Sequence, residues 1–161
     1  MRIVLPLIAL LLIPCTLWSA GFSAQVTGVV DGDTIDVRHS ERLERIELYG
    51  IDCPEKGQPL GKRAKQATSD LVFGKQVQIA KRGTDRDKHI VADVLLPDGK
   101  NVNQSLVLNG WCWWARDHAP KDLALRQAEE VAKAMRKGVW EDPNPVPPWL
   151  YRRRLRSGAH P

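Results

Sequence analysis

Short segments in which apolar and polar residues alternate are the feature that most constrains how this chain folds. Each runs for five to seven residues, and turn-forming Gly, Pro, Asp or Asn residues lie near most of their ends. Alternation with a period of two predicts strands that bury one face. The predicted strands are residues 25–30, 34–38, 43–49, 75–81 and 90–96.

Helical patterns interrupt and follow these strands. The predicted helices are residues 60–73, 103–109 and 121–137, and a glycine follows each of them. Glycine just past the last apolar turn is a typical helix stop. A helix between the third and fourth of five short strands predicts a mainly β fold of the α+β class. We expect a five-stranded barrel of the OB type with about three helices.

The N-terminal residues have the layout of a secretory signal peptide. A basic start is followed by the apolar residues 3–18 and then by small residues. Because a membrane span needs about 20 apolar residues and two prolines interrupt this stretch, we expect export without a lasting membrane span. The sequence defines no clear cleavage site. The expected organisation is a signal peptide at 1–24, a folded domain at 25–142 and a Pro/Arg-rich tail at 143–161.

Export changes the expected state of the cysteines. Cys15 would leave with the signal peptide, so that Cys53 and Cys112 remain in a periplasmic or secreted monomer. A pair of cysteines in an oxidising compartment favours a disulfide, and two are too few for a zinc site. The bond would close a loop of about 60 residues and stabilise the fold by roughly 4 kcal/mol.

The positive charge of the chain is concentrated near its C-terminus. The net charge of +5 arises from 24 Lys and Arg against 19 Asp and Glu. Apart from Arg2, the excess equals four arginines, which are Arg152, Arg153, Arg154 and Arg156. Such a run binds phosphate backbones or anionic surfaces. The alternative is a solvated tail without a partner.

Two short acidic segments carry the strongest functional signal. Residues 31–34 (Asp-Gly-Asp-Thr) and 52–55 (Asp-Cys-Pro-Glu) each lie where a predicted strand meets a turn. Their carboxylates would project toward a shared rim, and clustered oxygen ligands suit Ca²⁺ or Mg²⁺. A divalent ion beside a spare carboxylate can activate water against a phosphodiester. The alternative is ordinary turn chemistry, because Asp-Gly and Pro-Glu are common in turns.

The acidic segments, together with later motifs, resemble the staphylococcal nuclease (thermonuclease) family in their order along the chain. The motifs are VDGDT at 30–34, LYGIDCPE at 48–55, IVADV at 90–94, NVN at 101–103 and GVW at 138–140. The resemblance covers about residues 25–142. It implies an OB-fold domain, dependence on Ca²⁺ and hydrolysis of DNA or RNA.

The resemblance also assigns roles to individual residues. Asp33 and Asp52 match the calcium carboxylates of the family, and Thr34 completes the first turn. Cys53 follows the second aspartate and would contribute only its backbone carbonyl. Glu55 matches the carboxylate that handles the attacking water, as general base or as orienting group.

The likeness fails at the two arginines with which the family grips the phosphate. Their positions hold Glu47 and His89. Candidate replacements are Arg45, on the same strand face as Glu47, Arg86 in the following loop, and protonated His89 itself. Alternatively, Arg45 and Arg86 are solvated surface charges, as long cationic side chains mostly are.

Two functions therefore remain open. The first is an exported Ca²⁺-dependent endonuclease for DNA or RNA, whose catalysis is weakened by the missing arginines. The second is a non-catalytic OB-fold module that keeps the calcium site and binds nucleic acid or another ligand. The retained Asp33, Asp52 and Glu55 favour the first, and the lost arginines favour the second.

Overall fold

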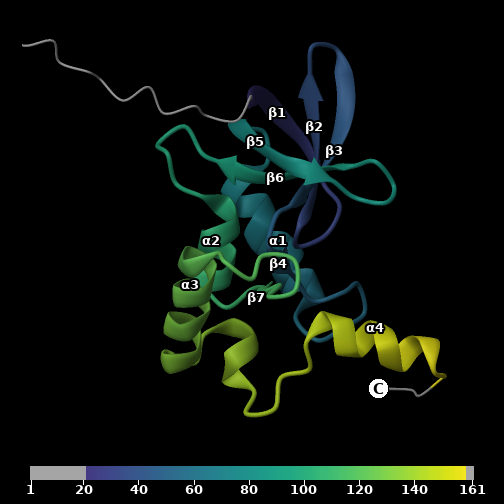
Figure 1. Cartoon of the computed structure of the whole chain (residues 1–161), viewed down its shortest axis with the longest axis vertical. Coiled ribbons are helices and arrows are strands. Elements are labelled where there is room, and N and C mark those ends of the chain that lie inside the picture. The colour runs from purple at the N-terminus through teal and green to yellow at the C-terminus, as the bar shows by residue number, and fades with distance from the viewer. Residues whose placement is uncertain (1–20, 159–161) are drawn as a thin grey trace, which may run out of the picture.

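The alternating segments form five strands that close into a barrel in the order β1-β2-β3-β6-β5. They are β1 (Phe22–Val29), β2 (Thr34–His39), β3 (Arg42–Leu48), β5 (Gln76–Thr84) and β6 (Ile90–Leu95). This computed structural model describes residues 21–158. Figure 1 shows the barrel at one end of the molecule and the helices beneath it. The predicted five-stranded barrel with helices is confirmed.

The barrel core follows from the period of two in the strands. Ile35 and Val37 of β2, and Val77 and Ile79 of β5, are each at most 1% exposed. All neighbouring strands pair antiparallel except β3 and β6, which pair in parallel and complete the closure. Closure leaves no free sheet edge in the barrel, so the rim of the barrel is where turns can present side chains.

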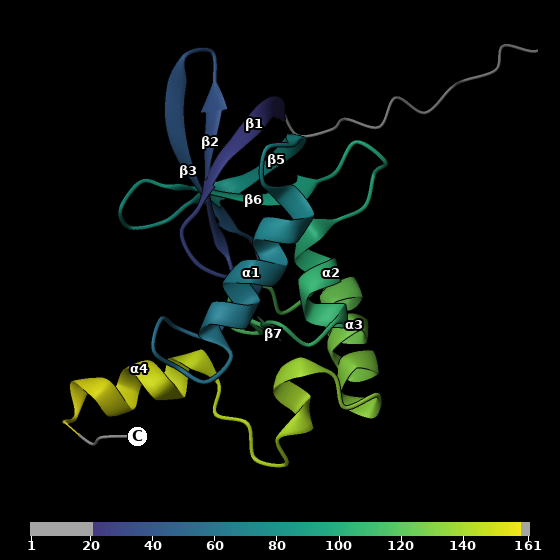
Figure 2. The ribbon, with the colours of Figure 1, turned by 180° about the vertical axis from the view of Figure 1, so that it is seen from behind.

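Four α-helices and one short 3₁₀ helix lie in the described part of the chain. They are α1 (Gly61–Val72), α2 (Val102–Leu108), α3 (Leu123–Ala134), η1 (Gly138–Glu141) and α4 (Pro148–Arg156). Asn101 and Asp122 cap α2 and α3, because each side chain accepts a hydrogen bond from a backbone N–H of the first turn. Figure 2 shows α1, α2 and α3 gathered on the same side of the barrel.

Helix α4 lies inside the segment 143–161 that the sequence assigned to a tail. It begins at Pro148, a residue suited to the first turn of a helix because it needs no backbone partner. Tyr151 is only 7% exposed, and the Gln58 side chain donates a hydrogen bond to the Val146 carbonyl just before the helix. The many arginines hide the short apolar face from a periodicity argument.

Strand β1 begins at Phe22, inside the expected signal peptide 1–24. Ala24 is 1% exposed and pairs with Val77 of β5, so these residues belong to the barrel. Residues 1–20, which hold the rest of the predicted signal peptide, lie outside the described residues. In residues 21–158, the helices are all too short or too polar to cross a membrane.

A second, two-stranded sheet lies beneath the barrel. In it β4 (Ile51–Asp52) pairs antiparallel with β7 (Trp113–Trp114). The predicted disulfide joins Cys53 and Cys112 directly beside this pair. Glu129 of α3, 2% exposed, accepts a hydrogen bond from the Trp114 N–H and pairs with Arg116 and Lys133. The disulfide and this buried carboxylate together fix the strand that carries Asp52.

Candidate active site

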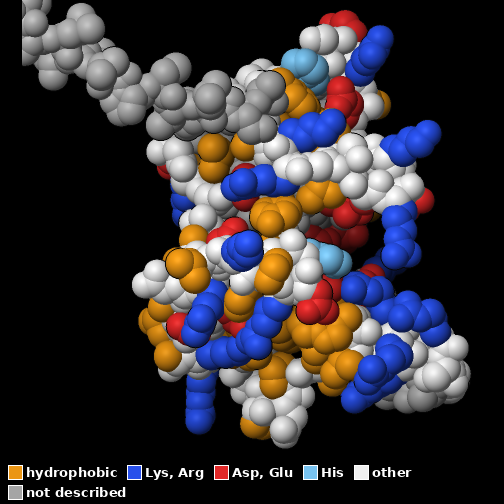
Figure 3. Space-filling model, in the orientation of Figure 1, with side chains coloured by type: hydrophobic (Ala, Val, Ile, Leu, Met, Phe, Trp, Pro, Cys, Tyr) orange, Lys and Arg blue, Asp and Glu red, His pale blue; other side chains and the backbone are white. Residues whose placement is uncertain are grey.

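The two acidic segments meet at one pocket of about 270 Å³ below the barrel. Asp31 and Asp33 come from the β1–β2 turn, Asp52 from β4, and Glu55 from the turn that follows β4. In Figure 3 a hollow below the barrel contains acidic side chains, and Lys and Arg side chains lie around it. The structure therefore brings together the carboxylates that the sequence singled out.

The β1–β2 turn is held in place by its own backbone and by α1. The Asp31 carboxylate accepts a hydrogen bond from the Asp33 N–H (3.2 Å), and the Thr68 hydroxyl of α1 donates one to the Gly32 carbonyl (2.6 Å). A Cβ at Gly32 would lie 2.6 Å from the Cβ of Cys53. Only glycine fits at this close approach, which explains the Asp-Gly-Asp pattern.

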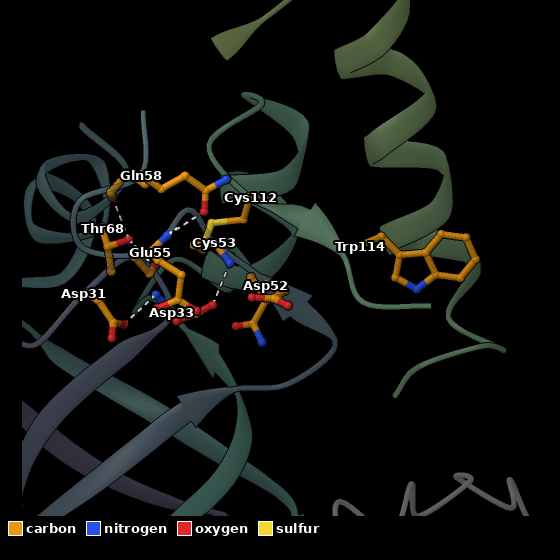
Figure 4. Close-up of a disulfide and its surroundings, with 12 residues drawn as sticks. Asp31, Asp33, Asp52, Cys53, Glu55, Gln58, Thr68, Cys112 and Trp114 are labelled. Atoms are coloured by element: carbon orange, nitrogen blue, oxygen red, sulfur yellow. Dashed lines mark hydrogen bonds between the residues drawn. A yellow bond between two sulfur atoms is a disulfide. The ribbon is translucent and has the colours of Figure 1, made fainter. Parts of the chain in front are cut away.

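One hydrogen bond links the two acidic segments. The Cys53 N–H donates to Oδ2 of Asp33 (2.7 Å), as Figure 4 shows. Cys53 is held by the disulfide, and the Glu55 N–H donates to the Gln58 side chain (3.0 Å). The carboxylate of Asp33 is thereby oriented by the segment that carries Asp52 and Glu55. Thr34 and Cys53 also line the pocket, as the resemblance requires.

The pocket carries an excess of negative charge. Burial and the neighbouring Asp31 carboxylate raise the pKa of Asp33 well above its usual value, and Asp52 adds to this; the hydrogen bond from Cys53 opposes it. Glu47 of β3 is a further carboxylate in the pocket wall. Oxygen ligands that repel one another at one point favour a hard divalent cation. The residues present therefore fit Ca²⁺.

Two of the pocket carboxylates, Asp52 and Glu55, bind the guanidinium of Arg152 from α4. Its two terminal nitrogens donate to the two oxygens of Asp52 at 3.0 and 2.7 Å. One of them also donates to Oε1 of Glu55 at 2.5 Å. The sequence indicated Arg152 only as part of a basic tail, and its place in the pocket follows from helix α4, which the sequence analysis did not predict.

The candidate replacements for the missing arginines lie elsewhere. Arg45 forms a cross-strand ion pair with Asp36 (2.9 Å), and Arg86 is exposed in the β5–β6 loop. His89 contacts Asp85 through Nδ1 (2.8 Å). Among the described residues, the pocket lining includes Glu47, His118 and Arg152. It does not include Arg45, Arg86 or His89.

Glu47, Asp85 and His89 form a compact cluster beside the pocket. Nδ1 of His89 lies 3.9 Å from Oε1 of Glu47, and potential ligand atoms of all three residues lie within 4.8 Å of one another. Burial and the Asp85 carboxylate raise the pKa of Glu47. Glu47 and His89, which stand at the two arginine positions of the family, therefore both contact Asp85 in this chain. In this arrangement neither is available to grip a phosphate.

The other arginines of the tail differ from Arg152. Arg153, Arg154 and Arg156 are exposed, whereas the Arg152 side chain is 39% exposed and ion-paired. His118, which no sequence motif marked, lies at the pocket wall after the tryptophan run. Nothing in its local sequence distinguishes it from a surface histidine.

Comparison with known families adds an independent observation. Residues 45–142 match the model of the family described as staphylococcal nuclease homologue. The match begins within β3 and ends before α4. It includes Asp52, Glu55 and the disulfide, and it excludes Arg152.

Individual relatives cover most of the chain. An "Uncharacterized endonuclease" of Escherichia coli is 38% identical over 135 residues, which are 84% of this chain and 88% of the relative. A "Micrococcal nuclease" of Shigella flexneri is 35% identical over 150 residues, 88% of this chain and 86% of the relative. A "Probable staphylococcal-like nuclease CAN1" of rice, Oryza sativa subsp. japonica, is 37% identical over 117 residues, 71% of this chain and 34% of that protein.

Proposed function

This chain belongs to the family of staphylococcal nuclease homologues, and from that premise we propose that it is an exported, monomeric, Ca²⁺-dependent endonuclease that cleaves phosphodiesters in DNA or RNA. The observation that carries the proposal is the convergence of Asp31, Asp33, Asp52 and Glu55 on one pocket. The disulfide between Cys53 and Cys112 supports a periplasmic or secreted location.

The carboxylates have distinct proposed roles. Asp33 and Asp52 would hold Ca²⁺, with Thr34 beside them and the Cys53 backbone carbonyl as a further oxygen ligand. A bound Ca²⁺ would supply positive charge that offsets the charge of the phosphate and favours ionisation of water. The Cys53 N–H supports this role of Asp33, because its hydrogen bond fixes the carboxylate at 2.7 Å.

Glu55 is the proposed general base or orienting group for the attacking water. Its side chain is 36% exposed, so water can reach it, and its backbone is fixed by Gln58. Ionised Glu55 would accept the proton that the water loses on attacking phosphorus. Arg152 donates a hydrogen bond to Oε1 of Glu55 (2.5 Å), and this contact orients the carboxylate within the pocket.

Catalysis is expected to be weakened at the positions of Glu47 and His89. Loss of one preorganised donor costs roughly 10²–10³ in rate. Arg86 and His89 remain proposed contacts to the phosphate, but His89 would have to leave Asp85, and Arg45 would have to leave Asp36. Arg153, Arg154 and Arg156 are proposed to bind the nucleic-acid backbone away from the scissile bond, as exposed cations do.

One observation favours a second function, a non-catalytic module that binds nucleic acid or another ligand. Glu47 adds a negative charge to the pocket, and Arg152 occupies hydrogen-bonding positions of both Asp52 and Glu55. A protein of this kind would bind Ca²⁺ and nucleic acid without cleaving it. Cleavage assays separate the two functions directly.

The deciding experiment is phosphodiester cleavage by purified protein that begins at residue 21, with Ca²⁺ and with a chelator. We expect slow cleavage of DNA or RNA with Ca²⁺ and none with the chelator. Glu55→Gln should abolish the activity, because it removes the proton acceptor but keeps the shape of the side chain. Activity that persists in Glu55→Gln, or that ignores the chelator, would contradict the proposed mechanism.

Calcium binding can be measured without any turnover. Isothermal titration should show one site, and Asp33→Ala or Asp52→Ala should abolish it, because each removes a charged ligand. Asp70→Asn is the matched control, since Asp70 is an exposed carboxylate on α1 outside the pocket. A wild-type protein that binds no Ca²⁺ at millimolar concentration would refute the calcium site.

A further inference from the structure

We propose that Arg152 is a catalytic residue, which binds the scissile phosphate in place of the two arginines that Glu47 and His89 replace. The inference rests on the proposed nuclease function. It assigns α4, outside the part of the chain that matches the family, to the active site. The sequence offered Arg45, Arg86 and His89 for this role, and the structure brings none of them into the described pocket lining.

Arg152 has the geometry that phosphate recognition needs. Its terminal nitrogens grip the two oxygens of Asp52 as a fork and reach Glu55 with a third hydrogen bond. A phosphate presents oxygens to a guanidinium in the same bidentate way as a carboxylate. Three of the five N–H donors of the side chain serve these bonds. The guanidinium bridges Asp52 and Glu55, so it is within reach of a phosphate that binds beside these two carboxylates.

The position of Arg152 is supported by the same residues that hold the carboxylates. The Gln58 side chain, 7% exposed, accepts a hydrogen bond from the Glu55 N–H and donates one to the Val146 carbonyl. One buried amide therefore ties the Glu55 turn to the segment that leads into α4. Preorganisation of this kind is what a catalytic donor requires.

A second contact ties α4 to β7, the strand that pairs with the strand carrying Asp52. Trp149 of α4 lies edge-on to Trp113, with ring centroids 6.5 Å apart, and Trp113 pairs with Asp52 across the β4–β7 sheet. Tyr151, next to Arg152, is buried. Helix α4 thus presents one of its arginines to the pocket, while Arg153, Arg154 and Arg156 remain exposed.

In the proposed reaction, a water oxygen forms a bond to phosphorus and its proton passes to Glu55. The bond from phosphorus to the leaving sugar oxygen breaks, and that oxygen takes a proton from solvent. Negative charge on the non-bridging oxygens grows as the bond forms, and the guanidinium of Arg152 donates hydrogen bonds to them. When substrate binds, the guanidinium of Arg152 therefore releases the two oxygens of Asp52 and donates its hydrogen bonds to phosphate oxygens instead.

The test compares Arg152→Ala with Arg126→Ala in the cleavage assay with Ca²⁺, because Arg126 is an exposed arginine of α3 that pairs with Glu130 and lies outside the pocket. We expect Arg152→Ala to lower kcat by roughly 10²–10³-fold, and Arg126→Ala to cleave at nearly the wild-type rate. Arg152→Lys should recover only part of the loss, because lysine keeps the charge but not the fork. Added guanidinium should raise kcat of Arg152→Ala and leave the wild type unchanged.

Calcium titration of Arg152→Ala distinguishes a catalytic role from a structural one. Ca²⁺ should bind as tightly as in the wild type or more tightly, because Asp52 loses a competing partner; a lost site would show that Arg152 is merely structural. If the wild type cleaves and Arg152→Ala cleaves equally well or faster, Arg152 is a competitor of the metal and the inference is wrong. If the wild type itself shows no Ca²⁺-dependent cleavage, the proposed function fails and the catalytic role fails with it.

Discussion

Replacing Glu47 and His89 together by arginine is expected to raise kcat/KM for DNA cleavage by on the order of 10³-fold. The change removes a carboxylate from the pocket wall and supplies two charge-assisted donors for the phosphate. It also dissolves the Glu47–Asp85–His89 cluster, which holds both positions away from substrate. The measurement is the rate of cleavage of a DNA substrate in Ca²⁺, for the wild type, each single variant and the double variant.

The β5–β6 loop should survive these substitutions. The Asp85 carboxylate accepts a hydrogen bond from the backbone N–H of residue 89 (2.7 Å), and this bond does not depend on the side chain there. Glu55→Ala in the double-variant background should erase the gain. A wild type that cleaves DNA rapidly, with no improvement in the double variant, would mean that another cation already performs this task. Alanine substitutions at Arg45, Arg86 and Arg152 would then identify it.

Breaking the disulfide between Cys53 and Cys112 is expected to lower the free energy of unfolding by roughly 4 kcal/mol, because the bond closes a loop of about 60 residues. Urea denaturation of wild type and Cys112→Ser measures this loss. The effect should extend to the pocket, since Cys53 supplies the N–H that orients Asp33. Calcium affinity should fall on reduction, as titration with and without a reductant would detect.

Mass spectrometry of non-reduced digests provides the control for that experiment. The peptides that contain Cys53 and Cys112 should appear as one cross-linked species in protein isolated from an oxidising compartment. Two free, alkylatable thiols in such material would refute the bond. Equal calcium affinity in the oxidised and reduced protein would instead show that the disulfide does not influence calcium binding.

Local signals in the sequence were sufficient for the barrel. The period of two in segments such as 34–38 and 75–81 gives strands that bury Val37 and Val77, and turn residues mark their ends. The convergence of residues 31–34 and 52–55 was also predictable, because both segments follow strands at one rim. The disulfide between the two cysteines could be predicted once export to an oxidising compartment was expected.

Long-range contacts could not be predicted from the same signals. Arg152 meets Asp52 across 100 residues of chain, through a helix of nine residues whose composition is dominated by arginine. Glu129 looks like a surface residue of α3, yet it is 2% exposed, because Arg116 and Lys133 neutralise it beneath β7. In both cases the partner of a charge, rather than its own sequence context, decides where it lies.

Helix α4 gives the pocket a way to change its charge while the barrel stays folded. The contacts that hold the helix include the Gln58–Val146 hydrogen bond, the burial of Tyr151 and the ion pairs of Arg152. Local opening of a peripheral helix costs less free energy than unfolding the strands. Each opening would move the positive charge of Arg152 away from Asp52 and Glu55, while these carboxylates stay in place. Hydrogen exchange of the α4 amides would therefore quicken when Ca²⁺ takes over Asp52, and slow again when a phosphate gives Arg152 a new partner.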